Sequence, residues 1–147
     1  MAEPERLYEE DILLWSEQQA ELLRRRAADA LDWDNLAEEI GDVGLSQLHA
    51  VESLLVQALI HMLKAEAWPQ SREVPHWSAE AIRFRGDAAR RFVPSMRQRL
   101  DLAKLYRQAR RAIPTAIDGI PPALPLPATC PATLAELLSE ADEPSAD

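Results

Sequence analysis

A long apolar stripe without a proline runs through the middle of this sequence. Its members, spaced three or four residues apart, are Leu36, Ile40, Val43, Gln47, Val51, Leu54, Ala58 and Met62. That spacing is typical of one face of an amphipathic α-helix. It predicts a helix over residues 35–66, about 48 Å long at 1.5 Å per residue. Glycine weakens helices, so Gly41 and Gly44 leave open whether this helix bends.

The composition also favours helices over strands. Of the 147 residues, 47% are apolar and only four are glycine. Alanine, leucine, glutamate and arginine abound, whereas β-branched residues are few, a mixture typical of helical proteins. This length is also typical of one domain. We therefore predict an all-α fold in a single helical domain over residues 1–141, followed by a frayed acidic tail over residues 142–147.

Three further main helices are predicted, and prolines set the bounds of two of them. Apolar residues at helical spacing predict a helix over residues 9–28, before the long one. Pro69 ends the long helix, and Pro75 can open a helix that runs to residue 92. Pro94 begins the next helix, which ends near residue 113. Four main helices joined in this order predict an up-and-down bundle.

A proline-rich segment follows the fourth helix. Six of the eleven prolines lie in residues 114–131, where the chain cannot continue as a helix. Apolar residues between them predict a strap packed on the bundle rather than a free linker. These residues are Ile117, Ile120, Leu124 and Leu126. Thr133, with Glu136 three residues later, can cap a short last helix over residues 133–141.

Three stretches of the sequence, taken in order, resemble a known family. They are YEEDILLWSEQQAELLRRR, WDNLAEEIGDVGLSQLHAVESLLVQALIHMLKAEAWP and CPATLAELL. The resemblance is to the bacterial domain of unknown function family 29, and it covers nearly the whole chain. It implies an all-helical bundle, and it supplies no catalytic residues.

The charge of the chain is divided unevenly along its length. The net charge is −9, but residues 72–113 carry 11 basic and 4 acidic groups. This basic segment offers a face for an acidic partner such as nucleic acid, with Arg83, Arg90, Arg97 and Arg107 as candidates. The simpler interpretation is that basic helices pack against acidic helices of the same molecule. We expect Arg83, Arg90 and Arg107 to pair within the molecule.

The segment HMLKAEAWPQSREVPHW holds two of the three histidines, at its junction between two predicted helices. His61 and His76 are weak metal candidates, with Glu66 and Glu73 as the nearest carboxylates. The Glu-x-x-His spacing that helical metal sites favour is absent from the sequence. His61 also lies in the apolar stripe. We therefore expect a helix corner with a core histidine, and no metal, cofactor or catalytic residue.

The single cysteine and the N-terminal sequence bear on location. Cys130 alone cannot form an internal disulfide, and a lone cysteine fits a reducing cytoplasm. The first residues are acidic and lack the apolar core of a secretion signal. No apolar run approaches the roughly 18 residues of a membrane span. We expect a cytoplasmic protein that does not bind membranes.

The length of the central helix leads to a functional hypothesis. The other main helices are each only about 25–30 Å long, so part of the central stripe lacks an obvious cover. This favours a self-associating interaction module, a homodimer, over an enzyme, and leaves a further protein partner open. Two alternatives remain: a nucleic-acid-associated protein that uses residues 76–113, and a metal-dependent enzyme with a site near His61 and His76.

Overall fold

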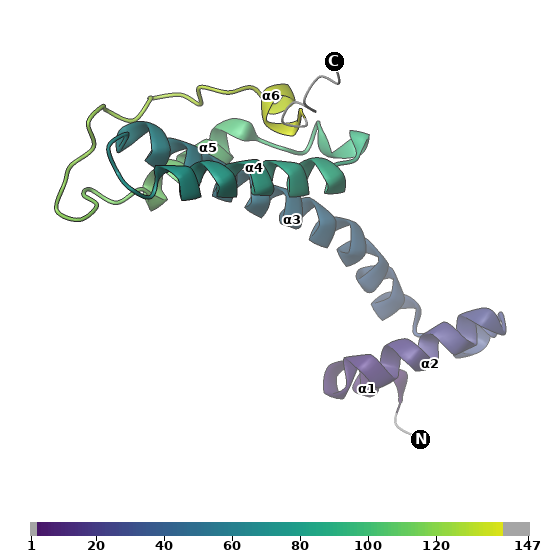
Figure 1. Cartoon of the computed structure of the whole chain (residues 1–147). Helices are drawn as coiled ribbons and strands as arrows, with labels where there is room; N and C mark the ends of the chain where they lie inside the picture. Colours follow the sequence, from purple (N-terminus) through teal and green to yellow (C-terminus); the bar gives the residue numbers. More distant parts are fainter. Residues whose placement is uncertain (1–2, 140–147) are drawn as a thin grey trace, which may run out of the picture. The chain divides into compact units, whose positions relative to one another are not determined.

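The protein is all-α, as predicted from its sequence. A computed structural model describes residues 3–139, and within that range it contains helices but no strand (Figure 1). The α-helices are α1 (Pro4–Glu10), α2 (Ile12–Arg24), α3 (Trp33–Ala67), α4 (Val74–Arg91), α5 (Leu102–Ala112) and α6 (Leu134–Leu138). Two short 3-10 helices are η1 (Ala28–Ala30) and η2 (Pro94–Met96).

The chain divides into two compact units, residues 1–46 and residues 47–147. Helix α3 supplies residues to both, so each unit is described by itself. The prediction of one domain over residues 1–141 stays a prediction. The predicted acidic tail, and the last two residues of the predicted helix 133–141, lie outside the described residues.

The predicted helix over residues 9–28 was wrong in its extent. The chain instead forms α1 and α2, which are separated by Asp11. Asp11 has an extended backbone, and its side chain accepts a hydrogen bond from the Leu14 N–H (3.1 Å). An aspartate in this position is a strong helix N-cap. The apolar spacing continues across this residue, which is why periodicity alone suggested one helix.

Helix α3 agrees closely with the predicted helix over residues 35–66. It runs from Trp33 to Ala67 as one continuous α-helix, so Gly41 and Gly44 do not interrupt it. Its 35 residues make it about 52 Å long. The helix stops two residues before Pro69, which disfavours helical backbone in the residue that precedes it.

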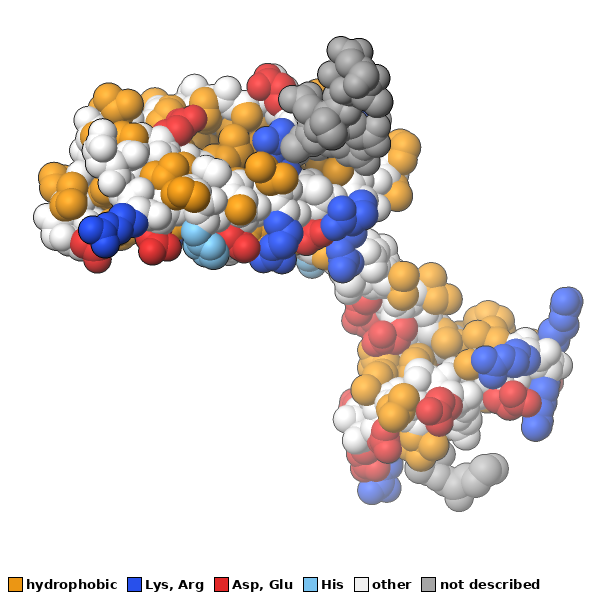
Figure 2. All heavy atoms as spheres, in the orientation of Figure 1, with side chains coloured by type: hydrophobic (Ala, Val, Ile, Leu, Met, Phe, Trp, Pro, Cys, Tyr) orange, Lys and Arg blue, Asp and Glu red, His pale blue; other side chains and the backbone are white. Residues whose placement is uncertain are grey.

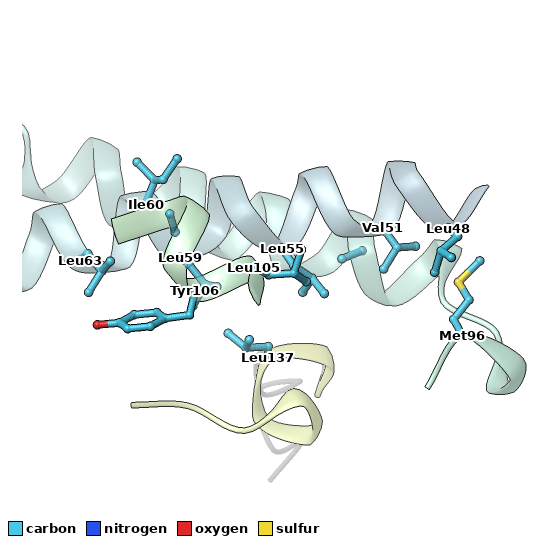
Figure 3. Packing of buried hydrophobic residues seen from close by; sticks show 12 residues of the cluster. Leu48, Val51, Leu55, Leu59, Ile60, Leu63, Met96, Leu105, Tyr106 and Leu137 are labelled. Atoms are coloured by element: carbon cyan, nitrogen blue, oxygen red, sulfur yellow. The ribbon is translucent and has the colours of Figure 1, made fainter. Parts of the chain in front are cut away.

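The apolar core of the second unit begins on α3 at Leu48. Side chains from α3, α5 and α6 point toward one another there (Figure 3). The buried members are Leu48, Val51, Leu55, Leu59, Ile60, Leu63, Ala88, Met96, Leu105, Tyr106, Ala109 and Leu137. Full burial of one such leucine contributes roughly 1.5–3 kcal/mol, so this core is the main source of stability of the unit.

The predicted helix over residues 94–113 was also wrong in its extent. Pro94 starts only the short η2, and α5 begins at Leu102. Asp101 separates them, because its side chain accepts a hydrogen bond from the Lys104 N–H (3.1 Å) and caps α5. Met96 of η2 is buried in the core. Both errors therefore have one cause, an aspartate N-cap inside a periodic apolar pattern.

The proline-rich strap contacts the second unit through backbone carbonyls. The Trp68 indole N–H donates to the Ile120 carbonyl (2.7 Å), and the Tyr106 hydroxyl donates to the Pro127 carbonyl (2.5 Å). Asp118 and Gly119 both have positive φ, 52° and 77°, as a tight hairpin turn requires. The strap therefore folds back over the α3–α4 corner.

Side chains of the strap differ in their burial. Ile117 and Leu126 are half-buried against the core clusters, whereas Ile120 and Leu124 are exposed. After the strap, the Thr133 hydroxyl oxygen accepts from the Glu136 N–H (3.1 Å). This is the predicted cap of the last helix.

Candidate functional surfaces

The apolar stripe of α3 is buried along one part of the helix and bare along another. From Leu48 onward it is in the core, where Val51 and Leu55 are 0% exposed. Before Leu48 the same stripe carries Ile40 and Val43, which are 68% and 66% exposed. The sequence pattern is the same in both parts, so only the packing distinguishes them. Figure 2 shows hydrophobic side chains at the surface of this N-terminal unit.

Helix α2 presents a second bare apolar face. Ile12 and Leu23 are each about half exposed, and they lie within about 20° of each other around the helix axis. The adjoining face of α2 holds Trp15 and Gln19, which are buried. Two adjoining faces of α2 therefore carry apolar side chains. The described residues bury only the face of Trp15 and Gln19 and leave the face of Ile12 and Leu23 exposed.

Polar contacts hold the N-terminal unit together. The Trp15 indole N–H donates to the Asp32 carboxylate (3.1 Å), and the Asp32 N–H donates to the Gln19 side-chain carbonyl (2.9 Å). The Tyr8 hydroxyl donates to the Glu39 carboxylate at 2.5 Å. That hydrogen bond is the largest cause that raises the pKa of Tyr8 to about 12.

Apolar burial in this unit is slight by comparison. Among described residues 3–46, Trp15 is the one large apolar side chain that is buried. The apolar clusters of residues 3–139 contain no member before Leu48. The unit therefore has polar contacts that fix its geometry, and little apolar burial to stabilise it.

The exposed apolar area of the N-terminal unit is large for its size. Its large apolar side chains with exposures from 39% to 68% are Ile12, Leu13, Leu14, Leu23, Trp33, Ile40, Val43 and Leu45. At about 100 Å² each, they present on the order of 800 Å². That is about what one partner contributes to a protein–protein interface of standard size.

His61 lies near the corner between α3 and α4, but it is half-buried, so the expectation of a core histidine was wrong. The Nδ1 atom of His61 lies 2.7 Å from the Gln57 carbonyl oxygen, and its ring packs against Phe84 with centroids 5.4 Å apart. His76, Glu66 and Glu73 are exposed. Among residues 3–139, no group of three or more His, Cys, Asp or Glu side chains is placed to hold a metal.

Glu80 is a carboxylate near His61 and His76 that was not among the candidates predicted from the sequence. Glu80 forms an ion pair with Arg83 (2.6 Å), which lowers the pKa of Glu80, and His76 and His61 lower it further. The signal was available, because His76 and Glu80 are four residues apart and share a helix face. Glu80 is therefore a carboxylate close enough to both histidines to feel their charge.

The candidate basic residues differ in their partners. Arg83 pairs with Glu80 and Asp87, and Arg90 also pairs with Asp87. Every ion pair within residues 3–139 joins side chains three or four positions apart on one helical segment. The expected pairing within the molecule is thus confirmed for Arg83 and Arg90, but their partners are on α4 itself and not on acidic helices.

Arg107 and Arg97 behave differently from these two. Arg107 has no ion-pair partner among the described residues, so the expectation for Arg107 stays a prediction. The Arg97 guanidinium lies over the Phe92 ring, 5.3 Å from its centroid. Only part of the basic segment is therefore neutralised by neighbouring carboxylates.

A cavity of about 370 Å³ lies at the α3–α4 corner, beneath the hairpin turn of the strap. Trp68 and Ile120 contribute apolar surface, and Arg72, Glu73 and Asp118 also line it. Its volume is at the lower end of the range for ligand pockets. Because its charged groups have both signs, the lining does not select one class of ligand.

By length and composition, α3 is apolar enough to cross a membrane, with a mean hydropathy of 1.3 over its best window. The expectation that no apolar run approaches the length of a membrane span did not take this window into account. Polar residues interrupt the apolar run, although few of them are charged. A core helix meets the same criterion, and α3 contributes half of the buried residues in the larger apolar cluster of the second unit.

The sequence matches the family described as Domain of unknown function DUF29 over residues 7–141. An α-helical protein of unknown function from Rhodospirillum rubrum, with a crystal structure at 1.45 Å resolution, has a similar fold. The TM-score is 0.70 at 27% sequence identity, and the similarity covers 91% of this chain and 90% of that chain. No curated protein matches this chain.

Proposed function

Because this chain belongs to the DUF29 family of unknown function, its role must be inferred from its surfaces, and we propose that it is a self-associating interaction module. The apolar faces of α2 and of the first part of α3 bind the same faces of a second copy. The product is a homodimer.

The bare part of the α3 stripe carries this proposal. Ile40 and Val43 are two-thirds exposed on a helix whose later stripe residues are fully buried. Contiguous exposed apolar surface commonly marks an interface. With Ile12 and Leu23 on α2 and Trp33 on α3, the two faces present on the order of 500 Å² on each copy, which corresponds to an interface at the small end of the range.

A second copy suits this surface better than an unlike partner for two reasons. A unit of this size has too small a core to be stable alone, and association is a common remedy. Most charged residues also avoid the bare face: Asp34, Glu38 and Asp42 lie at least about 100° around α3 from Trp33, Ile40 and Val43. Glu39, about 40° from Val43, accepts the hydrogen bond of Tyr8. Two such faces can therefore meet around a twofold axis without burying like charges.

Substitution of Ile40 by glutamate tests the proposal. We expect Ile40→Glu to weaken the dimer by about 100-fold or more, because each copy would bury a carboxylate in an apolar interface. Light scattering and sedimentation equilibrium over a range of concentrations would measure the change. Circular dichroism should show equal helix content for the variant and the wild type at concentrations where both are monomeric, because the side chain is exposed in one copy.

Leu45→Glu is the matched control. It makes the same change on the same helix, but Leu45 lies about 140° around α3 from Ile40. We expect the dimer to persist in this variant. A wild-type mass of 16.5 kDa at every concentration would contradict the proposal. So would a monomer that co-sediments with phosphatidylcholine vesicles, since the apolar face would then bind a bilayer.

A further inference from the structure

Another cavity, of about 490 Å³, lies between α5 and the segment that joins the proline-rich strap to α6. Residues 102–107 of α5 form one wall, and residues 128–134 form the other. Both walls belong to the second unit, so the cavity does not depend on the position of the first unit. Its volume lies within the usual range for ligand sites. We call it the α5–strap cavity.

The walls of the α5–strap cavity are mostly apolar. Their apolar members are Leu102, Ala103, Tyr106, Ala128, Ala132 and Leu134. The Tyr106 ring is buried, and its hydroxyl already donates a hydrogen bond to the Pro127 carbonyl. This hydroxyl proton is therefore not available to a ligand, and the walls offer a surface for the apolar part of one.

The lining holds a single kind of charge. Among the described residues that line the α5–strap cavity, Arg107 alone is charged. Its guanidinium forms no ion pair with a residue that the structure describes. The cavity at the α3–α4 corner differs in this respect, because charged groups of both signs line it. A planar guanidinium matches the geometry of a carboxylate, which it can bind through two parallel hydrogen bonds.

We propose that the α5–strap cavity binds a small molecule with an apolar body and one terminal carboxylate, as in a medium-chain fatty acid. The Arg107 guanidinium pairs with the carboxylate, and the apolar body lies between α5 and the strap. Charge complementarity favours this class over a cation, because the described lining offers no carboxylate to pair with one. The inference is independent of the proposed homodimer, which uses residues of the first unit.

Cys130 provides a reporter of occupancy at this site. It is the only cysteine of the chain, it lines the cavity, and it is half-buried. A ligand in the cavity should therefore slow its alkylation by iodoacetamide. With decanoate as the probe at ten times its dissociation constant, about a tenth of the sites stay empty, and alkylation should be about tenfold slower. Isothermal titration calorimetry on the full chain would give the dissociation constant.

Three substitutions at exposed positions of α5 test the role of each wall. Arg107→Gln should weaken decanoate binding about tenfold or more, because it removes the charge-assisted hydrogen bonds. Arg111→Gln is the matched control, since it makes the same change in charge on the same helix outside the lining, and its affinity should equal that of the wild type. Ala103→Leu should abolish the protection of Cys130, because the larger side chain fills the cavity while leucine maintains the helix.

Two probes with the same alkyl chain test the selection by charge. Decyltrimethylammonium should leave the alkylation of Cys130 unchanged, and decanol should protect it less than decanoate does. Equal protection by decanol and decanoate, or equal decanoate affinity of Arg107→Gln and the wild type, would overturn the inference.

The location of the site has its own decisive outcome. Decanoate that does not slow the alkylation of Cys130 at any concentration below micelle formation would overturn the inference and leave the proposed homodimer intact. The same holds for decanoate that binds without protecting Cys130, since it would then occupy another surface. A monomeric wild type whose Cys130 is protected would support the inference and overturn the homodimer.

Discussion

Tyr8 reports on the hydrogen bond that joins α1 to the start of α3. The folded state holds the phenol proton more tightly, with a pKa of about 12 against a usual 10.0. The contact therefore stabilises the protein below about pH 10 and is lost as the pH rises through about 12. Only the neutral phenol can donate this proton to Glu39.

We predict that Glu39→Gln lowers the pKa of Tyr8 from about 12 toward 10.0, because it removes the largest cause of the shift. The ring carbon resonances of Tyr8, followed from about pH 9 upward, would measure it. Glu38→Gln is the control, since Glu38 acts only at a distance and has a smaller effect. Titration of wild-type Tyr8 near 10.0 would show that the hydrogen bond is absent in solution.

Individual residues were predictable where one helix face determined their role. The stripe identified Val51 and Leu55 as core residues, and both are fully buried. It could not distinguish Ile40 from them, because exposure depends on which segments pack on the helix. Arg107 and Arg83 were both predicted to form ion pairs within the molecule. Only Arg83 has carboxylates three and four residues away on its own helix.

At the scale of elements, Arg85 holds the last helix to the body of the second unit. Its guanidinium on α4 donates to the carbonyls of Glu136 (2.7 Å) and Leu137 (3.2 Å) on α6. Leu137 beside them is 1% exposed in the core. These carbonyls lie in the last turn of α6, where backbone acceptors have no partner within the helix.

We predict that Arg85→Lys loosens α6 without unfolding the core. An ammonium group on a shorter side chain cannot donate to both carbonyls in the geometry of the planar guanidinium. The loss should be about 1–3 kcal/mol of local stability, seen as faster amide hydrogen exchange at Leu137 and Ser139. Arg83→Lys, which changes an exposed ion pair, should leave these amides unaffected. Equal acceleration of exchange in α4 would mean that the whole unit had loosened.

The elements themselves were mostly predictable, and the exceptions have a physical cause. Helices α3 and α4 lie within two residues of their predicted bounds, because prolines and a strong apolar period define them. The two long helices that turned out to be divided each contain an aspartate, Asp11 or Asp101, that caps the following segment. An aspartate in an apolar periodic pattern should therefore be weighed as a helix start.

At the scale of the molecule, the two units differ in how they are stabilised. The second unit has a core of twelve buried residues, whereas the first has polar contacts and exposed apolar faces. If the first unit is stabilised by association, its stability depends on protein concentration.

We predict that amide hydrogen exchange in residues 3–46 slows as protein concentration rises, whereas exchange in α4 and α5 does not change. The exchange rates would be measured by mass spectrometry on the full chain across the dimer dissociation constant. Ile40→Glu should abolish the dependence on concentration. If amide exchange in residues 3–46 were equally slow at every protein concentration, the first unit would be stable by itself.

The long central helix led correctly to the hypothesis of an uncovered apolar surface, but not to its location. The hypothesis came from helix lengths, which leave a gap somewhere along the stripe. Only the packing shows that cover begins at Leu48. No sequence feature specified this point, because the stripe has the same period before and after it.

The continuity of α3 also limits how the length of this chain can change. Each residue turns the helix by about 100°. One residue inserted near Ser46 would rotate Ile40 and Val43 out of line with Val51 and bring Glu38 toward the apolar side. Seven inserted residues, close to two full turns, would restore the alignment to within about 20°. A seven-residue insertion in this part of the gene therefore preserves the apolar stripe of α3, whereas a one-residue insertion breaks it.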